Sequence, residues 1–316
     1  MTSSPSPDER ADLVVVGAGP AGASAAFWAS RLGWHAVLVD PLGIGGQLLN
    51  VELLPDYPGF PAGVAGWDLA AALGEQVLDS GVELVPGCAE RLERSAKGWC
   101  VAVDGRRLEA ATVLVATGCR PRPLPGAAAE LEGRGVSYGA ACDGAFVAGR
   151  RAVVVGGGEI ALAEAQTLAA VAGEVVVVFP ERETSASAAR ARAVAELPVV
   201  RLLPGWSLLS VQVEEGQVTG VELEEVDTHA RRVVDTDAVF GADDGPANGE
   251  LLAALGALDA GGAVRTDPAL AVVGAPGLFA AGDVRLGSFR RAATASGEGV
   301  GAAHAVDAFL RARSRP

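Results

Sequence analysis

The chain has 316 residues and a formal net charge of −14, and half of its residues are hydrophobic. This length is sufficient for two domains with separate cores and short for three. The negative charge disfavours nucleic acid and anionic membrane surfaces as partners, because contact would cost repulsion instead of releasing counterions.

The first residues, the apolar runs and the cysteines argue against a secreted, a membrane-spanning, a disulfide-rich or a zinc-binding protein. The first ten residues, MTSSPSPDER, have no hydrophobic signal segment, and we expect a disordered start there. The longest apolar runs are well below the roughly 20 residues that a membrane span needs. The four cysteines lack the spacing of a disulfide framework or a zinc site, so we expect reduced thiols and no metal. These features together predict a cytoplasmic protein.

From Ala11 the sequence ADLVVVGAGPAGASAAFWASRLGWHAVLVD predicts a strand, a glycine turn, a helix and a second strand ending at Asp40. Gly17, Gly19 and Gly22 have GxGxxG spacing between the first strand and the helix. Such glycines permit a tight turn, close approach of a pyrophosphate and close helix packing, and the helix N-terminus favours phosphate. Asp40 can accept hydrogen bonds from ribose hydroxyls. The unit therefore predicts a site for a dinucleotide with an unphosphorylated ribose.

A second unit of the same form covers residues 151–179, with Gly156, Gly158 and Ala161 at the positions of the three glycines. Residues 82–118 and 207–240 each predict a small antiparallel sheet that follows a Rossmann half. Residues 277–312 predict a strand, a turn containing Gly282 and Asp283, and a long helix of small residues. The expected fold class is α/β with two Rossmann-like domains.

Five motifs occur in a characteristic order: GIGGQL at 43–48, DYPGFP at 56–61, VLVATGCRPRPLPG at 113–126, GVSYGAACDG at 135–144 and GLFAAGDV at 277–284. On these motifs the chain resembles the low-molecular-weight bacterial thioredoxin reductases from about residue 11 to residue 310. The resemblance implies an FAD domain built from residues 11–120 and 249–316, an inserted NAD(P)-binding-like domain at 121–248, and a homodimer.

The resemblance also implies which residues hold FAD. They are Gly17, Gly19, Pro20, Ala21 and Gly22 at the pyrophosphate, Asp40 at the ribose, Gly46, Gln47 and Asp56 near the isoalloxazine, Thr117 and Gly118 in the ATG motif, Asp283 at the ribityl chain, and Arg290, Arg291 and Ala292 at the pyrimidine edge. Arginines and a helix N-terminus near that edge favour the reduced flavin.

The chain departs from this family at the redox dithiol. The family has two cysteines separated by two residues, whereas this chain has Gly139, Ala140, Ala141 and Cys142. Disulfide exchange needs one thiolate to attack and another to resolve, and Cys142 matches the flavin-proximal cysteine of the family. We therefore expect no normal thioredoxin reductase cycle. Cys142 is either a catalytic or flavin-tuning thiol or a small buried hydrophobic residue.

A second departure concerns the nucleotide. In the family a basic cluster binds the 2′-phosphate of NADPH after the strand that follows the second glycine loop. Here Phe179, Pro180 and Glu181 stand in that place, and Arg182 remains between Glu181 and Glu183, which compete for its charge. We expect poor NADPH binding, with NADH or a second flavin as alternative ligands of the loop.

The third departure is FGADDGPANGELL at 240–252, where Asp243 and Asp244 stand near the expected domain hinge. Paired carboxylates can share a proton for acid–base work, but we favour a solvated loop. The PAN spacing is also one residue longer than in the family.

Three functions stay open. The first is an FAD-dependent oxidoreductase that is not a conventional NADPH-thioredoxin reductase and passes electrons between a small substrate and oxygen or a protein carrier. The second is an NAD(P)H-dependent flavin reductase or ferredoxin-reductase-like enzyme. The third is a non-catalytic flavin- or nucleotide-binding sensor or scaffold. We favour the first because an intact flavin site accompanies a degraded NADPH site, with Cys142 at most tuning the flavin.

Overall fold

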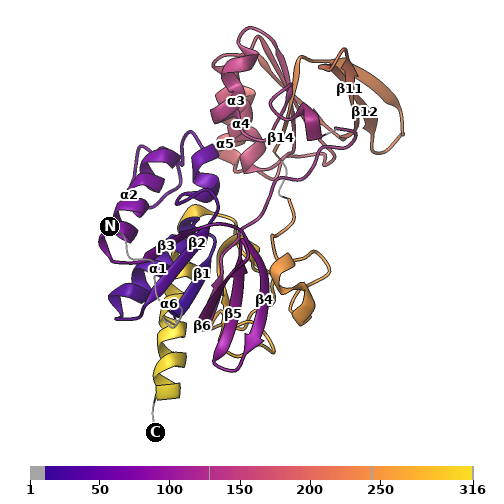
Figure 1. The fold of residues 1–316 in the computed structure, drawn as a ribbon. Helices are drawn as coiled ribbons and strands as arrows, with labels where there is room; N and C mark the ends of the chain where they lie inside the picture. Colours follow the sequence, from indigo (N-terminus) through magenta and orange to yellow (C-terminus); the bar gives the residue numbers. More distant parts are fainter. Residues whose placement is uncertain (1–10, 128, 243–244, 315–316) are drawn as a thin grey trace. The chain divides into compact units, whose positions relative to one another are not determined.

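The structure is a computed structural model that describes residues 11–127, 129–242 and 245–314. The chain divides into two compact units (Figure 1). The first unit contains Met1–Cys119 and Pro246–Pro316, and the second unit contains Arg120–Gly245. Within the described ranges, no helix is long and apolar enough to cross a membrane.

The first unit is built on one mixed sheet with strand order β3-β2-β1-β6-β5-β4, and β15 pairs with β6 as a branch. The strands are β1 (Ala11–Val16), β2 (Ala36–Asp40), β3 (Glu83–Pro86), β4 (Ala89–Ser95), β5 (Gly98–Val103), β6 (Arg106–Val115) and β15 (Leu278–Ala280). The valine-rich strands β1 and β2 are parallel, with Val14 opposite Val37. Parallel strands need a crossover, which the first helix supplies.

Strand β6 joins the two kinds of pairing. Its first half pairs antiparallel with β5, from Arg106 opposite Val103 to Ala110 opposite Trp99. Its second half pairs parallel with β1 and with β15. The small sheet that the sequence predicts after the first Rossmann half is therefore not separate. It continues the main sheet because one ten-residue strand is long enough to serve both.

The helices of the first unit are α1 (Pro20–Arg31), α2 (Gly66–Asp79) and α6 (Ala292–Ser314), with short 3₁₀ turns η1 (Gly46–Asn50), η4 (Glu250–Leu255) and η5 (Gly282–Val284). Helix α1 begins at a proline, whose fixed φ suits the first helical position. Its small residues allow α6 to approach closely. A Cβ added at Gly299 of α6 would lie 2.9 Å from the Ala21 carbonyl carbon and still closer to its oxygen.

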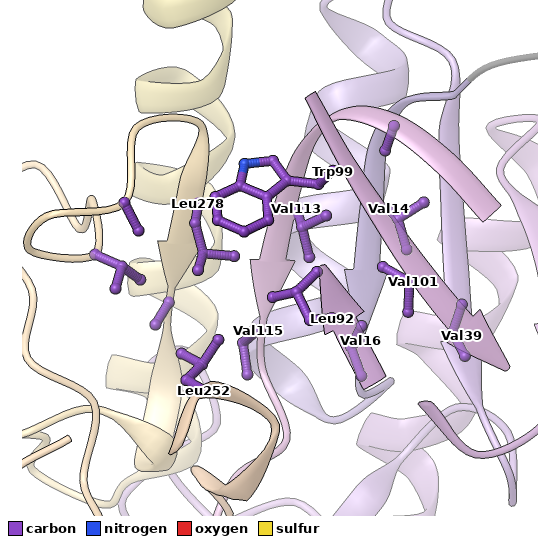
Figure 2. Close-up of a cluster of buried hydrophobic side chains, with 14 of the residues drawn as sticks. Val14, Val16, Val39, Leu92, Trp99, Val101, Val113, Val115, Leu252 and Leu278 are labelled. Atoms are coloured by element: carbon purple, nitrogen blue, oxygen red, sulfur yellow. The ribbon is translucent and has the colours of Figure 1, made fainter. Parts of the chain in front are cut away.

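Two cores cover the two faces of the first sheet. Alternate residues of β1 enter different cores, with Val14 and Val16 on one face and Leu13 and Val15 on the other. Figure 2 shows the first core, in which Trp99 lies among Val113, Leu278 and their neighbours. Trp99 is 1 % exposed, and its Nε1 donates to the Pro276 carbonyl at 3.2 Å. Both faces of the central parallel strands, such as β1, are therefore buried, as is usual for parallel strands.

The second unit contains a parallel sheet with strand order β10-β9-β8-β14-β7. Its strands are β7 (Val136–Ser137), β8 (Arg151–Val155), β9 (Glu174–Phe179), β10 (Val200–Pro204) and β14 (Ala238–Gly241), and its helical segments are η2 (Ala129–Leu131), α3 (Ala140–Asp143), η3 (Gly144–Val147), α4 (Glu159–Ala169) and α5 (Ala188–Ala195). A separate antiparallel sheet, β11 (Trp206–Glu214), β12 (Gln217–Glu225) and β13 (Arg231–Asp235), packs through Val211 and Val221 against Val153 and Val176 of the parallel sheet.

Candidate functional site

The first glycine loop connects β1 to α1. Gly17 has a φ of +101°, and a Cβ there would lie 2.7 Å from the Ala116 carbonyl carbon and closer to its oxygen. A Cβ at Gly22 would likewise lie 2.9 Å from the Gly17 carbonyl carbon and closer to its oxygen. At Gly19, by contrast, a Cβ would meet nothing within 4 Å. Gly17 and Gly22 are therefore needed for close packing. Gly19 leaves open space beside the loop, which fits the approach of a ligand phosphate.

Asp40 ends β2 beside this loop and is tied to it. Its Oδ2 accepts a hydrogen bond from the Ala18 backbone N–H at 2.8 Å. Its Oδ1 accepts from the N–H groups of Leu42 at 2.8 Å and Gly43 at 3.0 Å. A carboxylate has about four acceptor positions, so one remains for a ribose hydroxyl. The backbone fixes the carboxylate in the place that the sequence predicts.

The segment GIGGQL lies against the glycine loop. The Gly45 N–H donates to the Ala18 carbonyl at 2.9 Å, and a Cβ at Gly46 would lie 2.9 Å from the Gly19 Cα. The next residue, Gln47, donates from Nε2 to the Cys119 carbonyl oxygen and approaches its Sγ at 3.6 Å. Three sequence segments therefore meet here, and the sequence predicts FAD contacts in each of them.

Cys119 is the residue that sequence reasoning missed in this region. Its Sγ lies 3.9 Å from Oδ2 of Asp283, whose other oxygen accepts from the Ser288 hydroxyl at 3.0 Å. The thiol thus lies between two predicted flavin contacts, Gln47 and Asp283. The motif VLVATGCRP contains this cysteine directly after Thr117 and Gly118, and that position was the available signal.

The ATG motif is held by the chain segment that returns to the first unit. Thr117 donates from its hydroxyl to the Asn248 carbonyl at 2.6 Å, and the Asn248 side chain donates to the Thr117 carbonyl at 2.9 Å. The Asn248 N–H also donates to the Gly118 carbonyl at 2.9 Å. The asparagine of the PAN sequence therefore fixes Thr117 and Gly118, while Asp243 and Asp244 lie outside the described residues.

The start of α6 carries the remaining predicted contacts. Arg291 lies 3.5 Å from the Asp56 carboxylate, and the two side chains are 43 % and 55 % exposed, so the pair contributes little stability. Arg290 has a φ of +52°, and its N–H donates to the Ser288 hydroxyl at 3.1 Å. Ala292 begins the helix and packs beside Leu48 and Val64. The structure therefore brings Asp56, Arg291 and Ala292 to one end of α6.

The second glycine loop, between β8 and α4, repeats the backbone of the first. The Gly156 N–H donates to the Val178 carbonyl at 2.9 Å, as Gly17 does to Val39 at 2.8 Å. Phe179 stands at the end of β9, where Asp40 stands at the end of β2, and is 2 % exposed. A Cβ at Gly157 would lie 2.8 Å from the Phe179 ring. A buried phenyl ring offers no hydrogen bond to a ribose.

The first turn of α4 bears Glu159, held by a residue that sequence reasoning also missed. Oε1 of Glu159 lies 3.2 Å from Nε of Arg190, and Oε2 accepts from the Ser187 N–H at 2.8 Å. Burial raises the pKa of Glu159, but these donors outweigh burial and hold the pKa below its usual value. The Arg190 guanidinium also donates to Gln166 at 2.7 Å. This arginine is therefore engaged within the protein.

Arg182, the residual basic residue of the predicted phosphate site, has a partner other than the two neighbours that the sequence suggested. Its Nη2 lies 2.6 Å from the Asp227 carboxylate, and the two side chains are 85 % and 61 % exposed. Asp227 is therefore a further carboxylate that engages Arg182, beyond the two neighbours Glu181 and Glu183 expected from the sequence. The chain turn after β12 brings an aspartate from 45 positions away in the sequence to this guanidinium.

Around the missing dithiol, Gly139 is buried and precedes α3 with a φ of −164°. Its N–H donates to the Ser137 hydroxyl at 3.1 Å, and the Ala140 N–H donates to Glu164 of α4. This φ is extended backbone, so a residue with a side chain can adopt it. Cys142 belongs to α3, and its side chain lies outside the described part of the structure. In that described part no group of His, Cys, Asp or Glu could hold a metal ion.

The comparisons define the class of protein. Residues 11–299 match the family model of the pyridine nucleotide-disulphide oxidoreductases, and the chain belongs to this family. Thioredoxin reductase of Aquifex aeolicus is 30 % identical over 98 % of this chain and 96 % of its own length, and that of Treponema pallidum is 32 % identical over 95 % and 97 %. Within the family, the chain is an FAD-dependent oxidoreductase of the thioredoxin reductase type.

Solved structures agree with this assignment. The thioredoxin reductase of Lactococcus lactis in its FR conformation superposes with a TM-score of 0.92 at 27 % identity, over 96 % of this chain and 100 % of its own. The enzyme of T. acidophilum gives 0.89 at 26 % identity, over 96 % and 99 %. The family and the α/β fold with Rossmann-like elements that the sequence predicts are confirmed.

We expect bound FAD to protect Cys119 from alkylation. In FAD-free protein, iodoacetamide should modify the exposed Cys88 and the half-buried Cys119, and saturating FAD should slow modification of Cys119 at least tenfold. Cys88 serves as an internal control whose rate should not change. Cys100 is buried, and burial raises its pKa, so it should react only after unfolding. Peptide mass spectrometry over time measures each rate, and equal Cys119 rates with and without FAD would contradict the expectation.

Proposed function

We propose that the chain is an FAD-dependent oxidoreductase whose electron donor is not NADPH and whose electron acceptor is not thioredoxin. One contrast carries the proposal. At the first glycine loop, the Asp40 carboxylate is fixed beside open space at Gly19, whereas at the second loop Phe179 is buried against Gly157. The first arrangement suits a ribose and phosphate, and the second lacks an acceptor for ribose hydroxyls.

The residues of the first unit fit FAD. FAD supplies electron-pair transfer when bound, while the protein supplies binding and orientation. We propose that the loop residues Gly17 to Gly22 hold the pyrophosphate, that Asp40 holds the ribose, and that Asp283 holds the ribityl chain. Gln47, Asp56 and Arg291 would surround the ring. Family membership supports this arrangement and a homodimer.

The acceptor side lacks the family's chemistry for thioredoxin. A dithiol passes an electron pair to a disulfide by attack of one thiolate and resolution by the second. Gly139 leaves Cys142 without the partner three positions before it, so no internal disulfide can form at this place. We therefore propose that a small substrate or another carrier exchanges electrons with the flavin directly, with Cys142 at most tuning it.

A second candidate is an NAD(P)H-dependent flavin or ferredoxin-reductase-like enzyme, which would need no dithiol. The preserved backbone of the second loop, with the Gly156 N–H bonded to the Val178 carbonyl, favours it. A third candidate is a sensor or scaffold that holds a nucleotide or a second flavin without turnover. Both differ from the first in what the second loop binds.

Anaerobic titration separates the three candidates. We expect one FAD per chain, and we expect NADH and NADPH each to bleach the visible flavin band at least a hundredfold more slowly than in a thioredoxin reductase measured in parallel. Dithiothreitol should not produce long-lived reduced flavin, because the protein has no dithiol at this place to carry electrons from dithiothreitol to the flavin. Rapid bleaching by either nucleotide would favour the second candidate, and two flavins per chain would favour the third. Colourless protein that stays colourless with added FAD would contradict the FAD site itself.

A further inference from the structure

The turn after β15 is tied to α6 by a largely buried carboxylate. Oε2 of Glu298 accepts a hydrogen bond from the Gly282 backbone N–H at 2.7 Å and from Arg285 Nε at 3.1 Å. Its Oε1 accepts from Arg285 Nη2 at 2.5 Å. The Glu298 and Arg285 side chains are 15 % and 19 % exposed. Charge-assisted, two-pronged pairs of this kind are strong and fix geometry.

The same turn carries the predicted ribityl contact. Gly282 has a φ of +76°, and a Cβ there would lie 2.8 Å from the Cβ of Ala21 in helix α1. Glycine has no side chain and is conformationally permissive, so neighbouring groups must hold the backbone of Gly282 in this conformation. Asp283 follows at once, and its carboxylate lies between the Cys119 thiol and the Ser288 hydroxyl. The direction of Asp283 therefore depends on the conformation at Gly282.

We propose that Glu298 is a positioning residue for FAD: it holds the Gly282 N–H so that Asp283 keeps its direction toward the ribityl chain. Removing the carboxylate leaves the buried Gly282 N–H without its acceptor, while Arg285 keeps only its Nη1 contacts to the Thr266 hydroxyl and the Leu286 carbonyl. The turn then gains freedom that binding of FAD must remove. The inference rests on the FAD site proposed above and adds a residue that does not itself contact the cofactor.

The test compares Glu298→Ala with Asp307→Ala in the full-length protein. Asp307 lies on the same helix, its side chain is 18 % exposed, and it accepts from Trp34 Nε1 at 2.9 Å and Arg311 Nε at 2.7 Å. It is therefore a matched carboxylate away from the turn. FAD affinity is measured by fluorescence titration, and the environment of the bound flavin is measured by visible circular dichroism. The thermal midpoint without FAD is the structural readout.

We expect Glu298→Ala to weaken FAD binding at least tenfold and to change the visible dichroism, while Asp307→Ala changes FAD affinity less than twofold at a similar loss of thermal midpoint. Glu298→Gln keeps an acceptor for Gly282 but not the charge for Arg285, so it should weaken binding about threefold.

Equal FAD affinities for Glu298→Ala and Asp307→Ala would overturn the inference while leaving the FAD site intact. If Glu298→Ala does not fold, Glu298→Met, which keeps the side-chain length but removes the acceptor for the Gly282 N–H, replaces it, and unchanged affinity and dichroism in Glu298→Met overturn the inference. Absence of FAD binding by the unaltered protein would contradict the proposed function and not this positioning role specifically.

Discussion

Purified protein given NADPH and oxidised thioredoxin should reduce thioredoxin at least a thousandfold more slowly than the Treponema pallidum thioredoxin reductase under the same conditions, a difference of about 4 kcal/mol in barrier. On the proposed function, two separate steps are impaired. Gly139 removes the attacking thiol, and Phe179 with its neighbours removes the expected nucleotide contacts. The coupled assay follows NADPH consumption and thioredoxin thiols together.

Restoring one step should not restore the cycle. Gly139→Cys can adopt the extended φ of −164° at this position, and Gly139→Ser is its control for side-chain volume without a thiol. Neither variant should reduce thioredoxin with NADPH, because the nucleotide step is unchanged. With reduced thioredoxin as the electron source, only Gly139→Cys should bleach the flavin. Recovery of NADPH-dependent activity by Gly139→Cys alone would mean that the second loop binds NADPH despite Phe179.

The predictable parts of the fold are those that short sequence patterns encode. A valine-rich strand, three spaced glycines and a small-residue helix define the first loop locally, and the same pattern recurs at β8 and α4. Asp40 could be predicted because the strand that carries it ends beside the loop in any such unit. The boundary between sheets was less predictable. Strand β6 looks continuous in sequence but pairs in two directions, and which strand lies beside it depends on tertiary packing.

The parts of the site that escaped prediction are long-range side-chain contacts. Cys119 meets Asp283 across 164 positions, and Arg190 meets Glu159 across 31. Glu298 is only 16 positions from Gly282, but nothing in its helix marks it as an acceptor for a turn. No periodicity specifies such pairs, since each depends on how a later element returns to an earlier one. The roles of these residues toward FAD stay predictions.

The close approach of α6 to α1 predicts opposite effects for two neighbouring glycines. Gly299→Ala should lower the free energy of unfolding by about 3 kcal/mol. Its Cβ would lie 2.9 Å from the Ala21 carbonyl carbon and closer to the carbonyl oxygen, and these backbone atoms cannot move aside as a flexible side chain could. Gly297→Ala, on the same helix, has no atom within 4 Å of its Cβ and should raise that free energy by about 1 kcal/mol through helix propensity. Urea unfolding measures both.

The two variants should also separate at the cofactor. Ala21 belongs to the first turn of α1, beside the loop proposed to hold the pyrophosphate, so displacement of α1 in Gly299→Ala should weaken FAD binding at least tenfold. Gly297→Ala leaves this contact untouched and should bind FAD as the unaltered protein does. If Gly299→Ala unfolds at the same urea concentration as Gly297→Ala, the two helices do not meet through backbone at Ala21. If it is destabilised but binds FAD normally, the loop keeps its geometry independently of α6.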